Sequence, residues 1–327
     1  MLPRLWTLLE LALAAAPGYA ATFQADFATD PLAHGWQVFG DTNLFQWNVT
    51  NQNVAITWDS SQGNSCFQMP LGTIVTRDDD FSFALDLRLD DVSAGIDPGK
   101  PSTFELAFGL QNSVSAEKTN FFRGNARNAP NLAEFDFFPD TGYGPTVWPA
   151  AWSTNSAPNY NGPSDYTILD LPLGVVMRVS VDYSASAGVL TTTIATNGTP
   201  LASVHPVPLS PGFTDFRLGT FALESYSDAG QSGPLPGSIL AHGAVDNVVI
   251  TAPPPPVAEV SGAFTNGSWQ LEFLSRIHWL YTLERTTDFQ SWLAVSATVD
   301  GSGTNLVLQD SQPPVASACY RVRAERP

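Results

Sequence analysis

The stretch Phe81-Ser-Phe-Ala-Leu-Asp-Leu-Arg-Leu89 alternates strictly between apolar residues at odd positions and small or polar residues at even positions. A period of two is typical of a β-strand that turns one face to a core and the other to water or a ligand. Similar stretches recur along the chain, separated by Gly, Pro, Asn and Asp. Many strands of this kind indicate an all-β fold, either a two-sheet sandwich or a barrel.

The same pattern predicts the strands of a large domain. They are expected near residues 22–27, 35–40, 45–58, 64–69, 80–90, 104–111, 133–138, 175–183, 188–196, 216–224 and 239–251. The longest segment without a strand signal is 141–164, and a loop of that length inside a compact domain is often functional.

The run Pro253-Pro-Pro-Pro256 predicts a domain boundary, because a proline run favours an extended spacer and cannot continue a sheet. We therefore divide the chain into a leader at 1–20, a large all-β domain at 21–252, a linker at 253–257 and a small β-sandwich at 258–327. Arg4, an apolar run and Gly18-Tyr-Ala20 match a secretory signal with its cleavage site. The chain is expected to be secreted or held at the cell surface.

Charge and hydropathy argue against nucleic acids and membranes as binding partners. The net charge is -17, and only 14% of the 327 residues are charged. Nucleic acids and anionic membranes bind basic surfaces, so neither is an expected partner. No segment after the leader is apolar for long enough to span a bilayer, so no membrane insertion is expected. The alternative is that the acidic charge only keeps an exported chain soluble.

Cysteine and histidine give no sign of a zinc site. Cys66 and Cys319 fall in different predicted domains, and the four His residues are scattered singly. An exported chain could pair the two cysteines, but we expect two separate buried thiols, and no zinc.

The segment Leu132-Ala-Glu-Phe-Asp-Phe-Phe-Pro-Asp140 carries the most chemically suggestive pattern. If Phe135 and Phe137 face the core, Glu134 and Asp136 stand side by side on the opposite face, about 6.6 Å apart. Two carboxylates at that spacing can share one substrate. Glu105 occupies the equivalent face of the strand 104–111, so a curved sheet could carry all three acids. The alternative is a solvated outer face with ordinary acids.

The loop 143–166 is the second candidate binding element, with Tyr, Trp, Asn and Ser side chains. Sugars present apolar C–H faces and a rim of hydroxyls, which flat rings and polar partners match. The alternative is that the rings pin a proline-rich loop to the sandwich. Together with the acids, these rings give the predicted ligand-binding set: Glu105, Glu134, Asp136, Trp148, Trp152 and Tyr160.

The large domain resembles a concanavalin A-like lectin/glucanase jelly roll, the sandwich shared by many lectins and by the family 16 glycoside hydrolases. Glu134-Phe135-Asp136 is similar to the start of that hydrolase family's Glu-x-Asp-x-x-Glu strand. The resemblance implies Glu134 as nucleophile and Asp136 as its helper. The final Glu, the acid/base, is replaced by Pro139, or by Phe138 in the shorter variant. General acid catalysis is typically worth roughly 10²–10⁴-fold, so the motif is incomplete for hydrolysis.

The same resemblance implies a structural calcium ion, because many such domains hold one. Asp26 in the first strand and Asp246 in the last could lie together, since jelly rolls pair their terminal strands. Carboxylate oxygens suit this hard cation. The alternative is that Asp246 and Asn247 only shape a turn.

The small domain resembles a fibronectin-type-III-like C-terminal module of exported bacterial proteins, of the Verrucomicrobia and Planctomycetes type. The residues that carry the resemblance are Tyr281-Thr-Leu-Glu-Arg-Thr-Thr-Asp-Phe-Gln-Ser-Trp292 and Tyr320-Arg-Val322. Trp292 and Tyr320 are expected to be core aromatics.

These observations predict an exported, non-catalytic, lectin-like protein that binds a polysaccharide or glycan. A divergent glycoside hydrolase or polysaccharide lyase that uses Glu134 and Asp136 is the first alternative. A structural cell-surface protein that binds neither sugars nor metals is the second.

Overall fold

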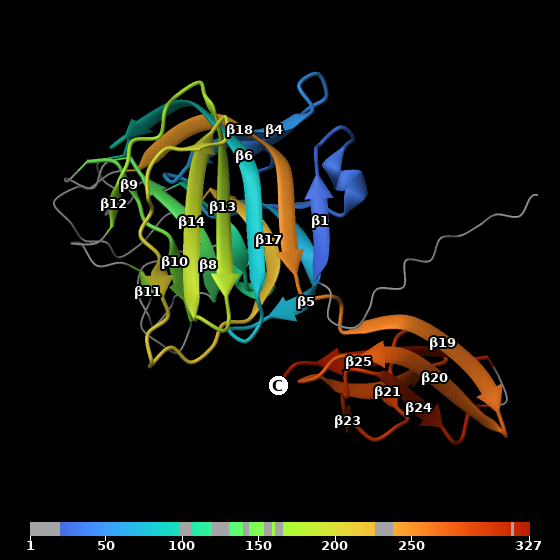
Figure 1. Cartoon of the computed structure of the whole chain (residues 1–327). Coiled ribbons are helices and arrows are strands. Elements are labelled where there is room, and N and C mark those ends of the chain that lie inside the picture. Colours follow the sequence, from blue (N-terminus) through green and yellow to red (C-terminus); the bar gives the residue numbers. More distant parts are fainter. Residues whose placement is uncertain are drawn as a thin grey trace, which may run out of the picture. The chain divides into compact units, whose positions relative to one another are not determined.

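The computed structural model describes residues 20–97, 106–119, 131–139, 144–153, 159–160, 166–225, 238–314 and 317–327. Nearly all of the predicted leader lies outside these residues. The chain divides into two compact units (Figure 1). The large unit is Ala21–Pro253, and the small unit contains Pro254–Pro327. The division falls within the proline run.

One sheet of the large unit, sheet I, carries the long strands that lie in front in Figure 1. Its central strand pairs are antiparallel, with β6 hydrogen-bonded to both β13 and β18. In spatial order the sheet contains β15 (Thr199–Pro200), β14 (Val189–Thr196), β13 (Val176–Ser184), β6 (Phe81–Ala94), β18 (Ile239–Ala252), β4 (Asn53–Asp59) and β3 (Phe45–Asn48), with β1 (Ala21–Ala25) also on β18 and β16 (Val207–Pro208) also on β14.

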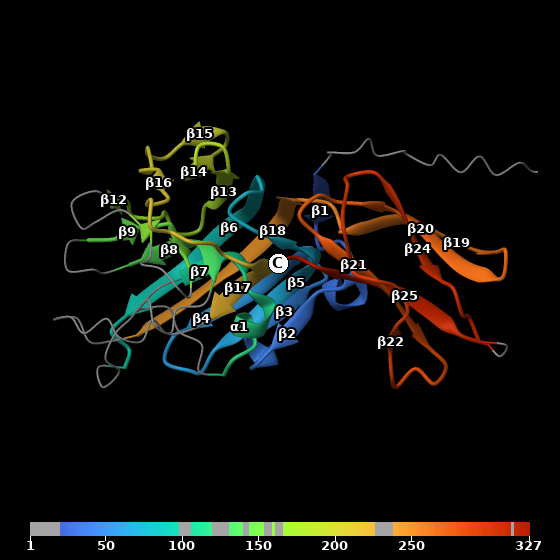
Figure 2. The ribbon, with the colours of Figure 1, turned by 90° about the horizontal axis from the view of Figure 1, so that it is seen from below.

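The second sheet, sheet II, forms the layer behind it, and Figure 2 shows both layers from below. It contains β11 (Asn159–Tyr160), β10 (Ala150–Trp152), β8 (Leu132–Phe138), β7 (Leu106–Gln111), β17 (Leu218–Ser225), β5 (Ser65–Val75) and β2 (Gln37–Phe39), with β9 (Thr146–Val147) on β8 and β12 (Thr167–Ile168) on β9. The short helical turns are η1 (Pro31–His34), η2 (Thr42–Leu44) and α1 (Ser113–Ala116).

The apolar side chains of the two sheets meet in one core. The five apolar residues of 81–89 are buried and the four residues between them are only half-buried, as the alternation predicts. Phe83 on sheet I contacts Phe108 on sheet II edge to face, with ring centroids 6.3 Å apart. Phe108 in turn stacks on Phe135 of the neighbouring strand, at 4.8 Å. The predicted all-β class and two-sheet antiparallel sandwich are therefore confirmed.

The prediction of a strandless segment at 141–164 is wrong. Its described residues contain β9, β10 and β11, and β10 pairs with β8. These strands have two or three residues each, too few for an alternating pattern to show in the sequence.

The small unit has seven strands among its described residues, in two sheets. One sheet has the order β19 (Val257–Thr265), β20 (Ser268–Ser275) and β24 (Asn305–Asp310). The other has β22 (Leu293–Ala294), β21 (Leu280–Thr286) and β23 (Val299–Asp300), with β25 (Cys319–Glu325) also on β21. Phe273 and Tyr281 join the two sheets, with ring centroids 5.0 Å apart.

The expectation that Trp292 and Tyr320 are core aromatics is wrong, because both are only half-buried. The guanidinium of Arg321 lies 4.1 Å from the centroid of the Trp292 ring. The buried aromatic side chains of this unit are Phe273, Trp279 and Tyr281. Phe273 lies on β20 and Tyr281 on β21, while Trp279 directly precedes β21.

The two thiols differ in environment. Cys66 is buried as expected, whereas Cys319 is exposed, and neither forms a disulfide. In the described part of the chain, no helix has the length and hydropathy needed to cross a membrane.

Candidate functional site

Strand β8 separates its acids from its phenylalanines. Phe135 and Phe137 belong to the main core between the sheets. Because side chains alternate along a strand, Glu134 and Asp136 lie on the other face of sheet II, which we call the outer face. Both side chains are fully buried, with 0% exposure. The alternative of a solvated face with ordinary acids is therefore wrong.

A glycine brings β8 close to its neighbour β7. Gly109 is paired with Glu134 in the register of the two strands. A Cβ atom at Gly109 would lie 2.3 Å from the carbonyl oxygen of Ala133 and 2.5 Å from the Cα of Glu134. No real Cβ tolerates these contacts, so only glycine lets the backbone of Glu134 take this position.

A third acid, Glu224 on β17, lies on the same outer face. Asp136 and Glu224 are both paired with Ala107, which stands between them on β7. Two strand spacings separate their Cα atoms, about 10 Å. Glu224 is 1% exposed. Sequence reasoning missed it, although Leu218-Gly-Thr-Phe-Ala-Leu-Glu-Ser225 alternates and carries Glu224 opposite its core residues.

Amide and hydroxyl side chains of this face form hydrogen bonds with Glu224 and with Glu117, which follows α1. Gln111 Nε2 donates a hydrogen bond to Glu224 Oε2. Gln68 Nε2 donates to Glu117 Oε1 at 2.7 Å, and Thr220 Oγ1 donates to Gln68 Oε1 at 3.2 Å. Buried charge is costly unless other groups compensate it, so this network accounts for part of the burial.

Cys66 borders the outer face, because it is paired with Glu224. Burial, and secondarily the charges of Glu224 and Glu117, raise the pKa of the Cys66 thiol. The reactive form of cysteine is the thiolate. Cys66 therefore stays protonated and serves as a packing residue.

The two predicted tryptophans lie on different sides of sheet II. Trp152 is 4% exposed and packs with Leu132, Ala107 and Ala150 at one end of the outer face. Trp148 packs against the main core instead, and its ring centroid lies 5.7 Å from that of Phe138. Only Trp152 therefore shares a face with Glu134 and Asp136.

Two further predicted site residues, Glu105 and Tyr160, lie wholly or partly outside the described structure. Glu105 lies outside the described residues. The backbone of Tyr160 pairs with Ala150 in β10, and the position of its side chain lies outside the described part of the structure.

The predicted metal ligands lie where the terminal strands of the large unit meet. β1 pairs with β18 in antiparallel register, from Ala21 opposite Ala252 to Ala25 opposite Val248. Partial burial, and then the charges of Asp86 and Asp26, raise the pKa of Asp246, against a hydrogen bond from Asn247 N–H that lowers it. In the described residues, no group of three or more His, Cys, Asp or Glu is arranged to hold a metal ion.

No protein-family model matches the chain, and no curated protein matches it. Several solved structures resemble it in fold. Peanut lectin is 14% identical, with 71% of this chain and 97% of that chain covered and a TM-score of 0.41. Lectin II from Ulex europaeus is 12% identical, with 72% of this chain and 100% of that chain covered and a TM-score of 0.45. The carbohydrate recognition domain of Emp47p is 10% identical, with 73% of this chain and 100% of that chain covered and a TM-score of 0.42. These similarities are remote, so the chemistry of this chain rests on its own side chains.

Proposed function

We propose that this chain is an exported, non-catalytic carbohydrate-binding protein that holds a glycan on the outer face of sheet II. The observation that supports this most strongly is the concentration of buried polar side chains on that face. Burying them lowers stability, and natural sequences accept such costs mainly at functional sites. The side chains are Gln68, Gln111, Glu134, Asp136, Thr220 and Glu224.

This set has the chemistry that sugars require. Carboxylates accept hydrogen bonds from hydroxyl groups, and amide side chains both donate and accept them. Gln111 Oε1 has no hydrogen-bond partner among the described residues, so it can accept one from a ligand. Trp152 adds an apolar ring for the C–H face of a sugar. The carboxylates are buried, so glycan binding at this face requires that they become accessible.

Retention on immobilised β-glucans and algal polysaccharides tests the proposal. We expect the full chain to be retained, and Glu134→Gln to weaken retention by about tenfold because a charge-assisted hydrogen bond is lost. Trp152→Ala should weaken it as well. Glu272→Gln is the matched control, because Glu272 is an exposed acid in the small unit.

The outcome also separates the alternatives. If no glycan is retained by the full chain, the structural-protein alternative is favoured. If retention is the same in wild type, Glu134→Gln and Trp152→Ala, the outer face is not the site.

The position of Glu224 supports a second candidate function, a glycoside hydrolase. Inverting enzymes hold their two carboxyl groups about 6.5–9.5 Å apart, and the side chains of Asp136 and Glu224, leaning toward each other over Ala107 on the outer face, can meet that distance. This candidate predicts release of soluble sugar from a retained polysaccharide. Glu224→Gln and Asp136→Asn would each abolish the release.

A further inference from the structure

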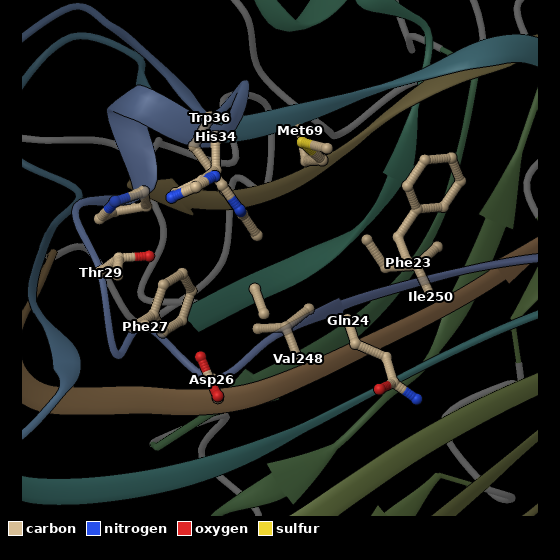
Figure 3. A pocket seen from close by; sticks show the side chains of 12 residues that line it. Phe23, Gln24, Asp26, Phe27, Thr29, His34, Trp36, Met69, Val248 and Ile250 are labelled. Atoms are coloured by element: carbon tan, nitrogen blue, oxygen red, sulfur yellow. The ribbon is translucent and has the colours of Figure 1, made fainter. Parts of the chain in front are cut away.

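A pocket of about 250 Å³ opens at the edge of the sandwich, away from the outer face of sheet II (Figure 3). It lies between β1 of sheet I and Met69 on β5 of sheet II, beside the segment from Phe27 to Trp36. All of its lining residues belong to the large unit.

The lining of the pocket combines apolar side chains with polar ones, among them Gln24. Figure 3 shows Phe23, Val248 and Ile250 on one side and Trp36 and Met69 on the other. Trp36, Val248 and Ile250 are buried parts of the main core, whereas Phe23 and Met69 are half-buried. An engineered apolar cavity of about 150 Å³ holds benzene, so this pocket has room for a substituted six-membered ring.

Contacts within the protein hold the walls of the pocket. Trp36 stacks on Phe67 with ring centroids 4.6 Å apart and planes 12° from parallel. Phe27 meets the edge of Trp36 at 5.4 Å, and its carbonyl accepts a hydrogen bond from Trp47 Nε1 at 2.9 Å. Asp30 caps η1 by accepting from Leu32 N–H at 2.9 Å. A ligand would therefore spend little binding energy on ordering these walls.

The backbone at Phe27 is strained in a way that supports a binding role. Its φ is +48°, in the left-handed region that a bulky side chain rarely enters. Such outliers cluster at ligand sites, where the surrounding structure maintains them. Here the outlier holds the Phe27 ring against Trp36 in the pocket wall.

Polar groups stand at the rim. Thr29 and His34 line the pocket with a hydroxyl and an imidazole, and both are exposed. Asp26 is the one formally charged residue among those that line it. In a chain of net charge -17, an anionic ligand is repelled.

We propose that this pocket binds a small neutral or cationic aromatic compound. The ring lies between Phe23, Phe27 and Trp36, and a hydroxyl or amine head group hydrogen-bonds to Thr29 at the rim. The site shares no residue with the outer face of sheet II, so it is independent of the glycan-binding proposal.

Fluorine NMR titration of the full chain with para-fluorophenol tests this site. We expect saturable binding that Phe23→Ala weakens by about tenfold, because the ring loses one apolar wall. Thr29→Val should weaken it by about fivefold, the cost of one hydrogen bond. Phe39→Ala is the matched control, a half-buried phenylalanine outside the pocket. Glu134→Gln should leave phenol binding unchanged.

Several outcomes would overturn the proposal. These are no saturable binding, equal binding of para-fluorobenzoate, or binding that neither Phe23→Ala nor Met69→Ala changes. Preferential binding of methyl β-glucoside, lost in Phe23→Ala, would make the pocket a sugar site and reject the aromatic class. If Phe23→Ala does not fold, Met69→Ala and Thr29→Val carry the same comparison.

Discussion

At the scale of single residues, Gly109 controls whether Glu134 can occupy the outer face. The close approach of Ala133 and Glu134 leaves no space for a side chain on β7 at this point. The glycine weakens the strand in isolation, since it has no side chain to pack. Gly109 occurs in this buried strand because a larger residue would collide with the backbone of Ala133 and Glu134.

Gly109→Ala should therefore destabilise the large unit by about 2 kcal/mol, because the added methyl group overpacks the β7–β8 contact. Glycan retention should fall as well, since Glu134 is displaced. Gly212→Ala is the control, because no atom lies within 4 Å of a Cβ built there. Denaturant unfolding of both variants gives the comparison. Equal stability of the two variants would contradict this account.

The residue scale also shows what the sequence could predict. The alternation of 132–138 correctly places Glu134 and Asp136 opposite Phe135 and Phe137. Burial of the acids could not be predicted, because it depends on what packs above the sheet rather than on the strand itself. Glu224 lies almost ninety positions further along the chain. Only the strand order, with β7 between β8 and β17, brings it to the same face.

At the scale of elements, the pairing of β1 with β18 brings together charges of the same sign. Asp86 and Asp246 are directly paired in the register of β6 and β18, and Asp26 follows the end of β1. Arg178 offsets part of this charge through an ion pair with Asp86 at 3.2 Å. Burial is the main cause that raises the pKa of Asp246, and the charges of Asp86 and Asp26 raise it further, so the offset is only partial. A cation would complete it, and we keep calcium at Asp26 and Asp246 as a proposal.

Asp246→Asn tests this proposal through its pH dependence. A carboxyl whose pKa is raised on folding lowers stability once it ionises, so its penalty is present at pH 7 and absent at about pH 3. Without calcium, the variant should melt at a higher temperature than wild type at pH 7 and at the same temperature at pH 3.

Added calcium should then raise the melting temperature of wild type but not that of Asp246→Asn. Asp170→Asn, at an exposed position, is the control. A calcium response that is the same in all three proteins would reject the proposed ligands.

At the scale of the whole molecule, each unit has its own core. The fold class follows from the sequence because long strands of both units show the period of two, as in 81–89 and 268–273. The short strands β9, β10 and β11 escaped prediction, since pairing rather than their own pattern defines them. The pocket at Phe27 also escaped prediction, because its walls come from both sheets and from strands that lie far apart in the sequence.

A variant confined to one unit should therefore shift one thermal transition. In the small unit, burial would raise the pKa of Asp310, but hydrogen bonds from Gln312 N–H, Tyr320 and Arg285 outweigh it and lower that pKa. Arg285 Nη1 lies 2.7 Å from Asp310 Oδ2. Asp310→Asn should destabilise this unit by about 2 kcal/mol at pH 7. The transition of the large unit should not move.

The pH sign follows from the lowered pKa. The Asp310 carboxylate stabilises the small unit fully at a pH above the ordinary carboxyl pKa of about 4. This stabilisation is lost as the pH falls through the pKa of Asp310 in the folded state. Scanning calorimetry should show that the small unit of wild type melts at a higher temperature than that of Asp310→Asn at pH 7, and that this difference disappears in acid. A difference that persists at low pH, or a shift of both transitions, would contradict the assignment.

The pairing of β1 with β18 also sets when the large unit can finish folding. Its first strand waits for a partner at the far end, so sheet I stays incomplete during synthesis until residues 248–252 emerge. Contacts between such distant segments slow folding and leave unpaired strands exposed in the meantime. A nascent chain halted before that point would therefore keep one side of the sandwich open to chaperones or to proteolysis.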